Sequence, residues 1–401
     1  MLPNFGEIPR PNWIEINLDH LQSNIRYIRS LLPAKTKILL PVKADAYGHG
    51  SLAISFAAME AGIDFLGVAH LFEGIALREN GVKARILILG PCLESDFPLL
   101  KKHKLTPTIQ DLETAKALSL HNHSPLPTPH SPLKIHIKTD TGMHRFGVGF
   151  ENFEEIKKIC ELPNLEVEGI YSHFATADMQ GHSATESQLL RFDKLVNELE
   201  KQGIRPPLCH IANSPATLLT NKAHYDMVRP GIALYGYDPF GEFPSRFPIK
   251  PVLKLRSTVR ALRSVAKGEG ISYGHFFVAE KDMRVATIAI GYGDGYLRGE
   301  PSQGVIYIHG KACPILGRVC MDACMVDISE VPNVQVGDLA ECINGEFCEQ
   351  ISVEYFAKEH NTISYEITTR MARRLYRLYR YKGELMGWNE LSNKNFVGSK
   401  T

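Results

Sequence analysis

Eight short apolar runs alternate with amphipathic stretches through the first part of the chain, and this rhythm limits the possible folds most strongly. The runs that we interpret as strands span residues 38–42, 65–69, 86–89, 106–109, 133–138, 167–173, 208–212 and 225–228. The stretches with helical periodicity span residues 19–32, 51–61, 71–80, 111–120, 151–160 and 183–202. Eight strands in a strand–helix rhythm over about 200 residues match the expected size of a (β/α)₈ barrel. A doubly wound open sheet is the competing topology.

The pattern changes near residue 239, where a segment rich in Pro, Gly and Phe begins. Shorter runs follow at 252–265, 283–290, 304–309, 324–328 and 339–343, each bounded by Gly, Pro, Asp or Asn. Short apolar runs separated by turn-forming residues are typical of a mostly β domain. We therefore divide the chain into a barrel at 12–240, a mostly β domain at 241–381 that also takes residues 1–11, and a polar tail at 382–401. Residues 367–381 are interpreted as a closing basic helix.

Composition excludes several classes of protein. Hydrophobic residues make up 44% and charged residues 22% of the 401 residues, with a net charge of +1. Such a balance gives no reason to expect nucleic acid or a membrane as a partner. The first ten residues lack the apolar core of a secretory signal, and the eight cysteines form no Cys-x-x-Cys pair. We expect a cytoplasmic protein with reduced thiols and no metal site.

Polar side chains lie at the ends of five of the predicted strands. Lys43, the pair Asn213 and Ser214, and Arg229 each come after a strand, whereas Lys138 and His173 are the last residues of theirs. Each alone has an ordinary explanation, such as a surface charge or a histidine satisfied within the core. Barrel enzymes, however, place their chemistry at the carboxyl ends of the strands, so we expect these groups to meet at one rim.

Lys43 lies in the most informative motif, Pro-Val-Lys-Ala-Asp-Ala-Tyr-Gly-His-Gly at residues 41–50. Partial burial at a strand end disfavours the ammonium form and makes the amine a usable nucleophile. Tyr47 and the two glycines are suited to hold an anion beside it. A reactive lysine next to a phosphate site is what pyridoxal phosphate requires.

The segments around these residues resemble alanine racemase, and the resemblance runs from about residue 13 to 374. It implies that Lys43 binds pyridoxal phosphate as an aldimine and that Lys43 and Tyr273 act as the two bases that interconvert L-alanine and D-alanine. The resemblance also implies the cofactor contacts Tyr47, His173, Asn213, Ser214, Arg229, Gly231, Ile232 and Tyr365. It assigns Arg145, Met321, Asp322 and Tyr292 to the substrate and its entrance, and it implies a carbamylated Lys138.

Further expectations follow from the same resemblance. A homodimer would share its active sites between barrel and β domain, and the D-alanine formed would serve peptidoglycan synthesis. Gly293 stands where the family usually has alanine, which would loosen the entrance. Tyr273 could not be chosen among 15 tyrosines without the resemblance.

Three alternatives are open at this point. A decarboxylase on the same barrel would need a cysteine–aspartate motif and a glycine-rich phosphate loop, and neither is found. A non-catalytic pyridoxal phosphate carrier would resemble the barrel alone. A broad-specificity amino-acid racemase differs only in its pocket, and weak rejection of serine is compatible with the sequence.

Overall fold

The structure is a computed structural model that describes residues 11–122 and 131–387. Most of the predicted polar tail, most of the segment 1–11 and most of the proline-rich loop at 120–132 lie outside the described residues. The chain forms two compact units. One comprises Ile25–Ala44 and Ile54–Leu234 and is called the barrel unit here. The other comprises the chain up to Asn24, Asp45–Ala53 and the chain from Tyr235, and is called the β unit.

Eight parallel strands form a nearly closed ring in the barrel unit. They are β2 (Lys37–Pro41), β3 (Phe65–Val68), β4 (Arg85–Pro91), β5 (Thr106–Ile109), β6 (Leu133–Asp140), β8 (Leu165–Tyr171), β9 (Leu208–His210) and β10 (Met227–Val228). The ladder runs β10-β2-β3-β4-β5-β6-β8-β9. The backbone N–H of Asp226 donates to the carbonyl of Cys209 (3.1 Å) and that of Arg229 to Ala212 (2.9 Å), which links the two ends. The predicted barrel is therefore confirmed, and the open sheet is excluded.

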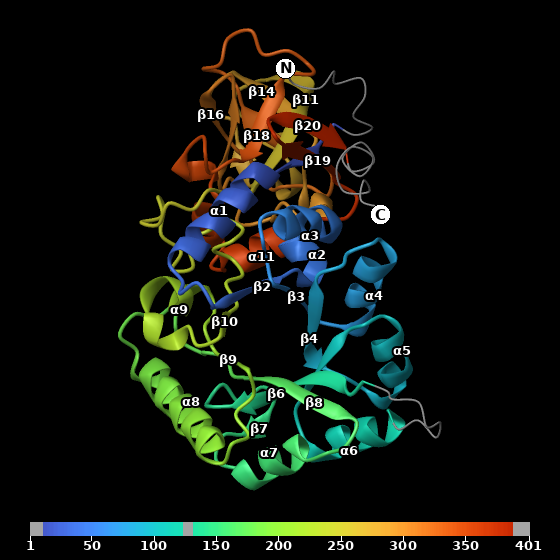
Figure 1. The fold of residues 1–401 in the computed structure, drawn as a ribbon. Coiled ribbons are helices and arrows are strands. Elements are labelled where there is room, and N and C mark those ends of the chain that lie inside the picture. Colours follow the sequence, from blue (N-terminus) through green and yellow to red (C-terminus); the bar gives the residue numbers. More distant parts are fainter. Residues whose placement is uncertain (1–10, 123–130, 388–401) are drawn as a thin grey trace. The chain divides into compact units, whose positions relative to one another are not determined.

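The helices of the barrel unit cover the outside of this ring (Figure 1). They include α4 (Leu71–Glu79), α5 (Phe97–Lys102), α6 (Leu112–His121), α7 (Phe153–Cys160), α8 (Ser183–Lys201) and α9 (Ser214–Leu219). Asp111 starts α6 by accepting a hydrogen bond from the Thr114 N–H at 2.7 Å. The interior is apolar where five strands each contribute one buried side chain: Leu39, Phe65, Leu87, Leu208 and Met227.

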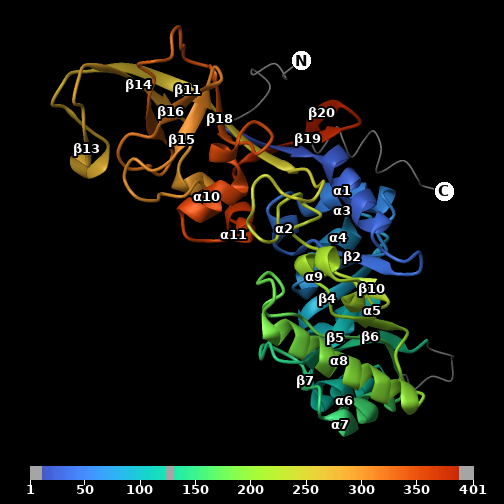
Figure 2. The ribbon, with the colours of Figure 1, turned by 90° about the vertical axis from the view of Figure 1, so that its left-hand side faces the viewer.

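Long strand β11 (Leu253–Val265) organises the β unit (Figure 2). Its partners are β1 (Trp13–Asn17), β14 (Met283–Ile288) and β18 (Leu339–Ile343). The remaining elements are β12 (Gly270–Ile271), β13 (Phe277–Val278), β15 (Val305–Ile308), β16 (Lys311–Pro314), β17 (Cys324–Asp327), α10 (Val353–Glu359), α11 (Ser364–Thr369), β19 (Tyr376–Tyr381) and β20 (Glu384–Gly387). The larger sheet is ordered β16-β15-β18-β11-β1-β19-β20. This unit is mostly β, as the sequence predicts.

Strand β1 is an element that the sequence division placed in the barrel. In the structure it pairs antiparallel with β11 and parallel with β19. The buried carboxylate of Glu15 fixes this arrangement, since it pairs with Arg256 of β11 at 2.6 Å and with Arg380 of β19 at 3.0 Å. An ion pair of this kind satisfies a charge that would be costly to bury alone.

The predicted basic helix at 367–381 is wrong for most of its length. Helix α11 ends at Thr369, and β19 occupies Tyr376–Tyr381. Tyrosine-rich alternation with arginine favours a strand once β1 offers a partner. Strand β20 pairs with β19, so the first residues of the predicted tail are also ordered. No helix of the described ranges is long and apolar enough to cross a membrane.

Candidate active site

Lys43 begins α2 (Lys43–Tyr47), which follows β2 after one residue. The next four residues have φ angles of +51°, +54°, +54° and +53°, so α2 is a left-handed turn of Ala44, Asp45, Ala46 and Tyr47. Residues with a Cβ rarely adopt this conformation, because each costs roughly 1–2 kcal/mol. Nothing in the composition of this segment signals such a turn, and sequence reasoning missed it.

Hydrogen bonds hold both ends of the turn. The N–H of Ala44 donates to the Glu73 carboxylate at 2.8 Å. Asp45 accepts the N–H of Ser51 at 2.8 Å through its side chain and that of Gly50 at 3.0 Å through its carbonyl. A strained backbone persists where the surrounding structure over-determines it, and it often marks a functional site.

Gly48 and Gly50 have a packing role that the sequence did not reveal. Gly48 has a φ of +82°, and a Cβ there would lie 2.0 Å from the carbonyl oxygen of Thr368. At Gly50, with a φ of +91°, a Cβ would lie 2.1 Å from the hydroxyl of Tyr379. Both glycines therefore permit close packing of the turn within the β unit, against α11 and β19.

Four basic side chains of the barrel unit, those of Lys43, Lys138, Arg145 and Arg229, all act on His173. Burial and then the charge of Arg145 lower the pKa of the Lys43 amine, partly offset by Glu73. Burial and the charge of Arg229 lower the pKa of Lys138 to about 7. An anionic ligand would relieve this repulsion, so the electrostatics of the barrel rim favour binding of a phosphate or a carboxylate.

Arg229 is held from several sides. Its Nη1 lies 2.7 Å from Nδ1 of His210, and its Nη2 donates to the carbonyl of Ser172 at 2.6 Å. Nη2 also lies 3.2 Å from Nδ1 of His173. Burial lowers the pKa of Arg229 to about 10, so the guanidinium stays protonated at neutral pH. Burial, followed by the charge of Arg229, lowers the pKa of His173, which is therefore neutral.

His210 is a functional candidate that the sequence did not identify. It lies in the middle of the predicted strand 208–212 and ends the observed strand β9, where a histidine is equally well explained as a satisfied core residue. The sequence does not indicate its contact with Arg229, because His210 ends β9 and Arg229 follows β10.

Two loops complete the barrel rim. Asn213 caps α9 by accepting the N–H of Ala216 at 3.3 Å, while the Ser214 hydroxyl accepts the N–H of Ala233 at 3.2 Å. The structure thus brings Ser214 beside the loop that contains Gly231 and Ile232. The loop that carries Arg145 begins at Asp140, whose carboxylate accepts three consecutive backbone N–H groups, those of residues 142–144.

Tyr47 and Tyr365 meet in the β unit. Their ring centroids lie 5.8 Å apart in an edge-on arrangement, and the Tyr47 ring lies 5.0 Å from that of Tyr235. Burial, followed by the neighbouring Tyr365, raises the pKa of Tyr47. Its hydroxyl therefore remains a hydrogen-bond donor, as recognition of a phosphate requires.

Three candidates of the β unit, Tyr292, Met321 and Asp322, lie where two loops contact each other. The N–H of Tyr292 donates to the carbonyl of Cys320 at 3.1 Å, and that of Gly293 to Met321 at 2.8 Å. Arg374 binds both Asp294 and Asp322, each at 2.7 Å. A Cβ on Gly293 would lie 2.7 Å from Nη2 of Arg374. Glycine at this position therefore leaves room for the Arg374 guanidinium. The sequence suggested only that Gly293 would loosen the entrance.

Tyr273 lies in a turn at Tyr273–His275, and 69% of it is exposed in the single chain. Phe276 and Met321 of the same unit are also more than half exposed, at 59% and 53%. Lys43 belongs to the barrel unit and Tyr273 to the β unit.

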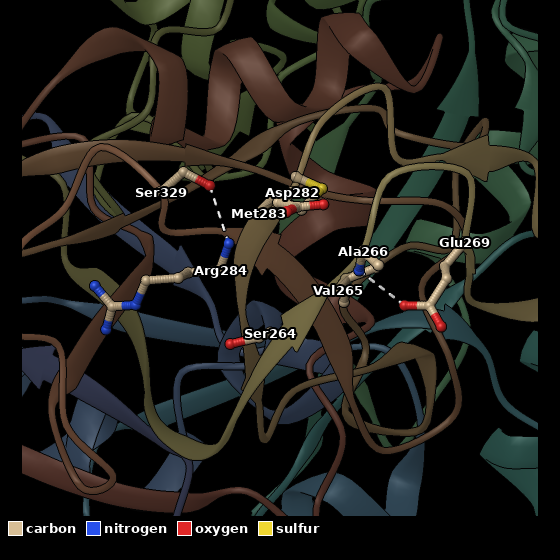
Figure 3. A pocket seen from close by; sticks show the side chains of 8 residues that line it. All are labelled: Ser264, Val265, Ala266, Glu269, Asp282, Met283, Arg284 and Ser329. Atoms are coloured by element: carbon tan, nitrogen blue, oxygen red, sulfur yellow. Dashed lines mark hydrogen bonds between the residues drawn. The ribbon is translucent and has the colours of Figure 1, made fainter.

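A separate hollow of about 560 Å³ lies in the β unit, lined by the paired ends of β11 and β14 and by the loops beside them (Figure 3). Two of its lining backbone groups are already satisfied, since Arg284 N–H donates to the Ser329 hydroxyl and Ala266 N–H to the Glu269 carboxylate. None of the predicted site residues lines it. Throughout the described part of the chain, no cluster of three or more His, Cys, Asp or Glu residues is arranged to hold a metal ion.

Comparison with known proteins identifies the family. The family model for the alanine racemase N-terminal domain matches residues 16–239, and that for the C-terminal domain matches residues 252–379. The alanine racemase of Halothermothrix orenii is 40% identical over 377 residues, which cover 94% of this chain and 98% of that protein. The alanine racemase of Methanococcus maripaludis is 38% identical, with 93% and 99% covered.

Solved structures agree with this match. Alanine racemase of Clostridium difficile 630 has a TM-score of 0.86 at 34% identity, covering 95% of this chain and 98% of that one. The enzyme of Bacillus anthracis with bound L-Ala-P has a TM-score of 0.85 at 34% identity, with 95% and 98% covered. That of Bartonella henselae, with covalently bound pyridoxal phosphate, has a TM-score of 0.80 at 28% identity, with 92% and 100% covered. The chain therefore belongs to the alanine racemase family of isomerases.

Proposed function

We propose that the protein interconverts L-alanine and D-alanine with pyridoxal phosphate as its cofactor. The observation that carries this proposal is the half-buried Lys43, whose pKa Arg145 lowers, on a rim where Lys138 and Arg229 also act on His173, because such a rim favours an anionic ligand. The covalently bound cofactor in the Bartonella henselae structure supports the same choice. When bound, pyridoxal phosphate withdraws electrons from the amino acid and makes its α-proton acidic.

Each unit contains residues that we assign to the cofactor. Lys43 would bind it covalently, and the Arg229 guanidinium would face its ring nitrogen, with His173 alongside. Phosphate contacts would come from the loops and hydroxyls described above: Tyr47, Asn213, Ser214, Gly231, Ile232 and Tyr365. Backbone N–H groups and neutral hydroxyls suit a dianion because they donate without adding a counter-charge that must be buried.

Racemisation requires that a proton leave one face of Cα and return on the other. We assign Lys43 to the α-proton of D-alanine and Tyr273 to that of L-alanine. Burial and Arg145 lower the pKa of Lys43, so a neutral amine is available to accept a proton closer to neutral pH. Arg145 and the backbone N–H of Met321 would bind the substrate carboxylate, with Asp322 close by and Tyr292 at the entrance.

The assembly that fits these roles is a homodimer with shared sites. Tyr273, Phe276 and Met321 are exposed in the single chain, and large exposed apolar groups often mark an interface. A two-fold arrangement would place the Tyr273 of one protomer at the Lys43 of the other, and would produce two equivalent sites. We assign the D-alanine formed to peptidoglycan synthesis in the cytoplasm.

The test begins with the purified protein and its Lys43→Arg variant. Wild-type protein should bind pyridoxal phosphate with a visible absorption band, and borohydride should fix the cofactor on a peptide that contains Lys43. Polarimetry should follow L-alanine to the racemic mixture, with no turnover by the variant. A reduced adduct on another lysine, or no racemisation by the loaded wild type, would contradict the proposal. Comparable rates with larger amino acids would favour the broad-specificity alternative.

A further inference from the structure

A chain of buried side chains runs from Arg229 through the interior of the barrel unit. Nη1 of Arg229 lies 2.7 Å from Nδ1 of His210. Nε2 of His210 lies 2.9 Å from Nδ1 of His136, on β6. Nε2 of His136 in turn lies 3.5 Å from Oε2 of Glu168, on β8. The chain thus links three strands of the ring to the rim arginine.

The chemistry of these groups permits only one arrangement of protons. A guanidinium can only donate, so Nδ1 of His210 must accept and its proton must lie on Nε2. That proton is donated to Nδ1 of His136, whose own proton must then lie on Nε2. Burial lowers the pKa of both histidines, so each is neutral and carries a single ring proton.

Glu168 supplies the acceptor at the end of the chain. Burial opposes ionisation of its carboxyl, but the contacts with His136 and Arg85 lower its pKa to about 2. Arg85 contacts Oε1 directly, and Nζ of Lys134 lies 3.2 Å from the same oxygen. Oε2 of Glu168 and Nε2 of His136 are both buried without a hydrogen-bond partner among the described residues, and they lie 3.5 Å from each other. The carboxylate is therefore charged and aimed at the histidine.

The local packing is built around the His136 ring. A Cβ on Gly169, the residue after Glu168, would lie 2.5 Å from Nδ1 of His136. Glycine is thus required for the ring to occupy its place. His210 is fixed as well, since its ring stacks on Tyr171 with centroids 4.8 Å apart and planes within 6°.

We propose that Glu168, His136 and His210 act as positioning residues that hold the guanidinium of Arg229 in place through fixed histidine tautomers. This inference rests on the proposed function, in which Arg229 faces the cofactor ring. Loss of the carboxylate removes the acceptor for Nε2–H of His136. A shift of that proton to Nδ1 would set two N–H groups face to face between the histidines, and the contact of His210 with Arg229 would weaken.

The first experiment reads the tautomers directly. Two-bond ¹⁵N–¹H NMR spectra of the ¹⁵N-histidine-labelled full chain should show both rings neutral with the proton on Nε2. An Nδ1–H form or an imidazolium at either ring near neutral pH would overturn the proposal. This measurement needs no variant, and it remains decisive even if substitutions at Glu168 prevent folding.

The second experiment compares Glu168→Gln with Glu166→Gln. Glu166 lies two residues earlier on β8, is half exposed and faces Lys134 at 3.6 Å, so it is a matched control. In Glu168→Gln the His210 resonances should move and kcat should fall about tenfold, while KM for alanine changes less than about twofold. Glu166→Gln should leave the His210 resonances and the kinetic constants unchanged.

Unmoved His210 resonances in a folded Glu168→Gln protein would assign Glu168 a structural role only. Absence of racemisation in wild-type protein would contradict the proposed function and leave the tautomer result standing.

Discussion

Lys138 shows how burial among cations changes the chemistry of a single residue. Only 6% of it is exposed, and its amine donates to the carbonyl of Thr139 at 2.7 Å. Burial is the largest cause of its lowered pKa, followed by the charge of Arg229. A carbamate at this position would carry a negative charge and would attract Arg145 and Arg229 instead of repelling them.

We therefore predict that Lys138 reacts with carbon dioxide. Its pKa of about 7 leaves the amine largely neutral above pH 7 and able to form a carbamate, whereas protonation below pH 7 prevents the reaction. Carbon-13 NMR after labelled bicarbonate should show a carbamate signal that declines as the pH falls through 7. The signal should vanish in Lys138→Arg and persist in Lys134→Arg, a half-exposed lysine of the same strand. A silent spectrum at pH 8 with excess bicarbonate would count against the modification.

Tyr273 should act on one enantiomer more than the other. Tyr273→Phe keeps the ring and removes the hydroxyl, so exchange of the α-proton of L-alanine with solvent should fall by more than about a hundredfold, as expected for loss of a general base. Exchange from D-alanine should be less affected. Proton NMR in deuterated water measures both, with Tyr376→Phe as an exposed control tyrosine. Equal losses for the two enantiomers would argue against separate roles.

The residue scale also shows what the sequence could not reveal. Lys43 and Arg229 follow predicted strands and Lys138 ends one, so the barrel rule alone predicted a common rim for them. His136 and Glu168 lie inside strands, where the sequence gives no sign that they continue the contacts of Arg229. Their relation depends on pairing between strands that are far apart in the chain.

Among the elements, regular strands and helices were predicted well and unusual ones were not. The eight barrel strands are apolar runs bounded by turn residues, and such patterns report burial directly. Helix α5 was missed because its six residues, Phe97–Lys102, are too few to show a period. The segment 376–381 was misread because its partner strand β1 lies more than 350 residues away.

The left-handed turn α2 gives a prediction at this scale. Ala44 is exposed with a φ of +51°, a conformation that glycine adopts without steric cost. Ala44→Gly should therefore leave the free energy of unfolding within about 1 kcal/mol of wild type or raise it. Ala76→Gly, at an exposed position inside the right-handed helix α4, should lower it by about 1 kcal/mol. Denaturant unfolding of the two variants measures the contrast, and equal destabilisation would contradict the assigned handedness.

At the scale of the whole molecule, the proposed dimer can be tested by mixing two inactive variants. Lys43→Ala and Tyr273→Ala should each abolish racemisation. If sites form between protomers, a mixed dimer has one intact site, and random exchange should restore roughly a quarter of wild-type activity. Sites built within one chain would all remain defective. Subunit exchange must be verified by a mass or fluorescence label, and exchange without recovered activity would reject shared sites.

Strand β1 has a consequence for how the protein is made. It leaves the ribosome well before its neighbours in the sheet, which are Leu253–Arg256 and Tyr376–Arg380. The last barrel strand ends at Val228, so the ring can close during synthesis while β1 still has no partner strand. Until β19 emerges, Trp13 and the carboxylate of Glu15 lack the surroundings that bury them. Emergence of β19 therefore determines when β1 is paired on both sides, and a nascent protein that stalls before Tyr376 would leave one edge of this apolar strand exposed to chaperones and proteases.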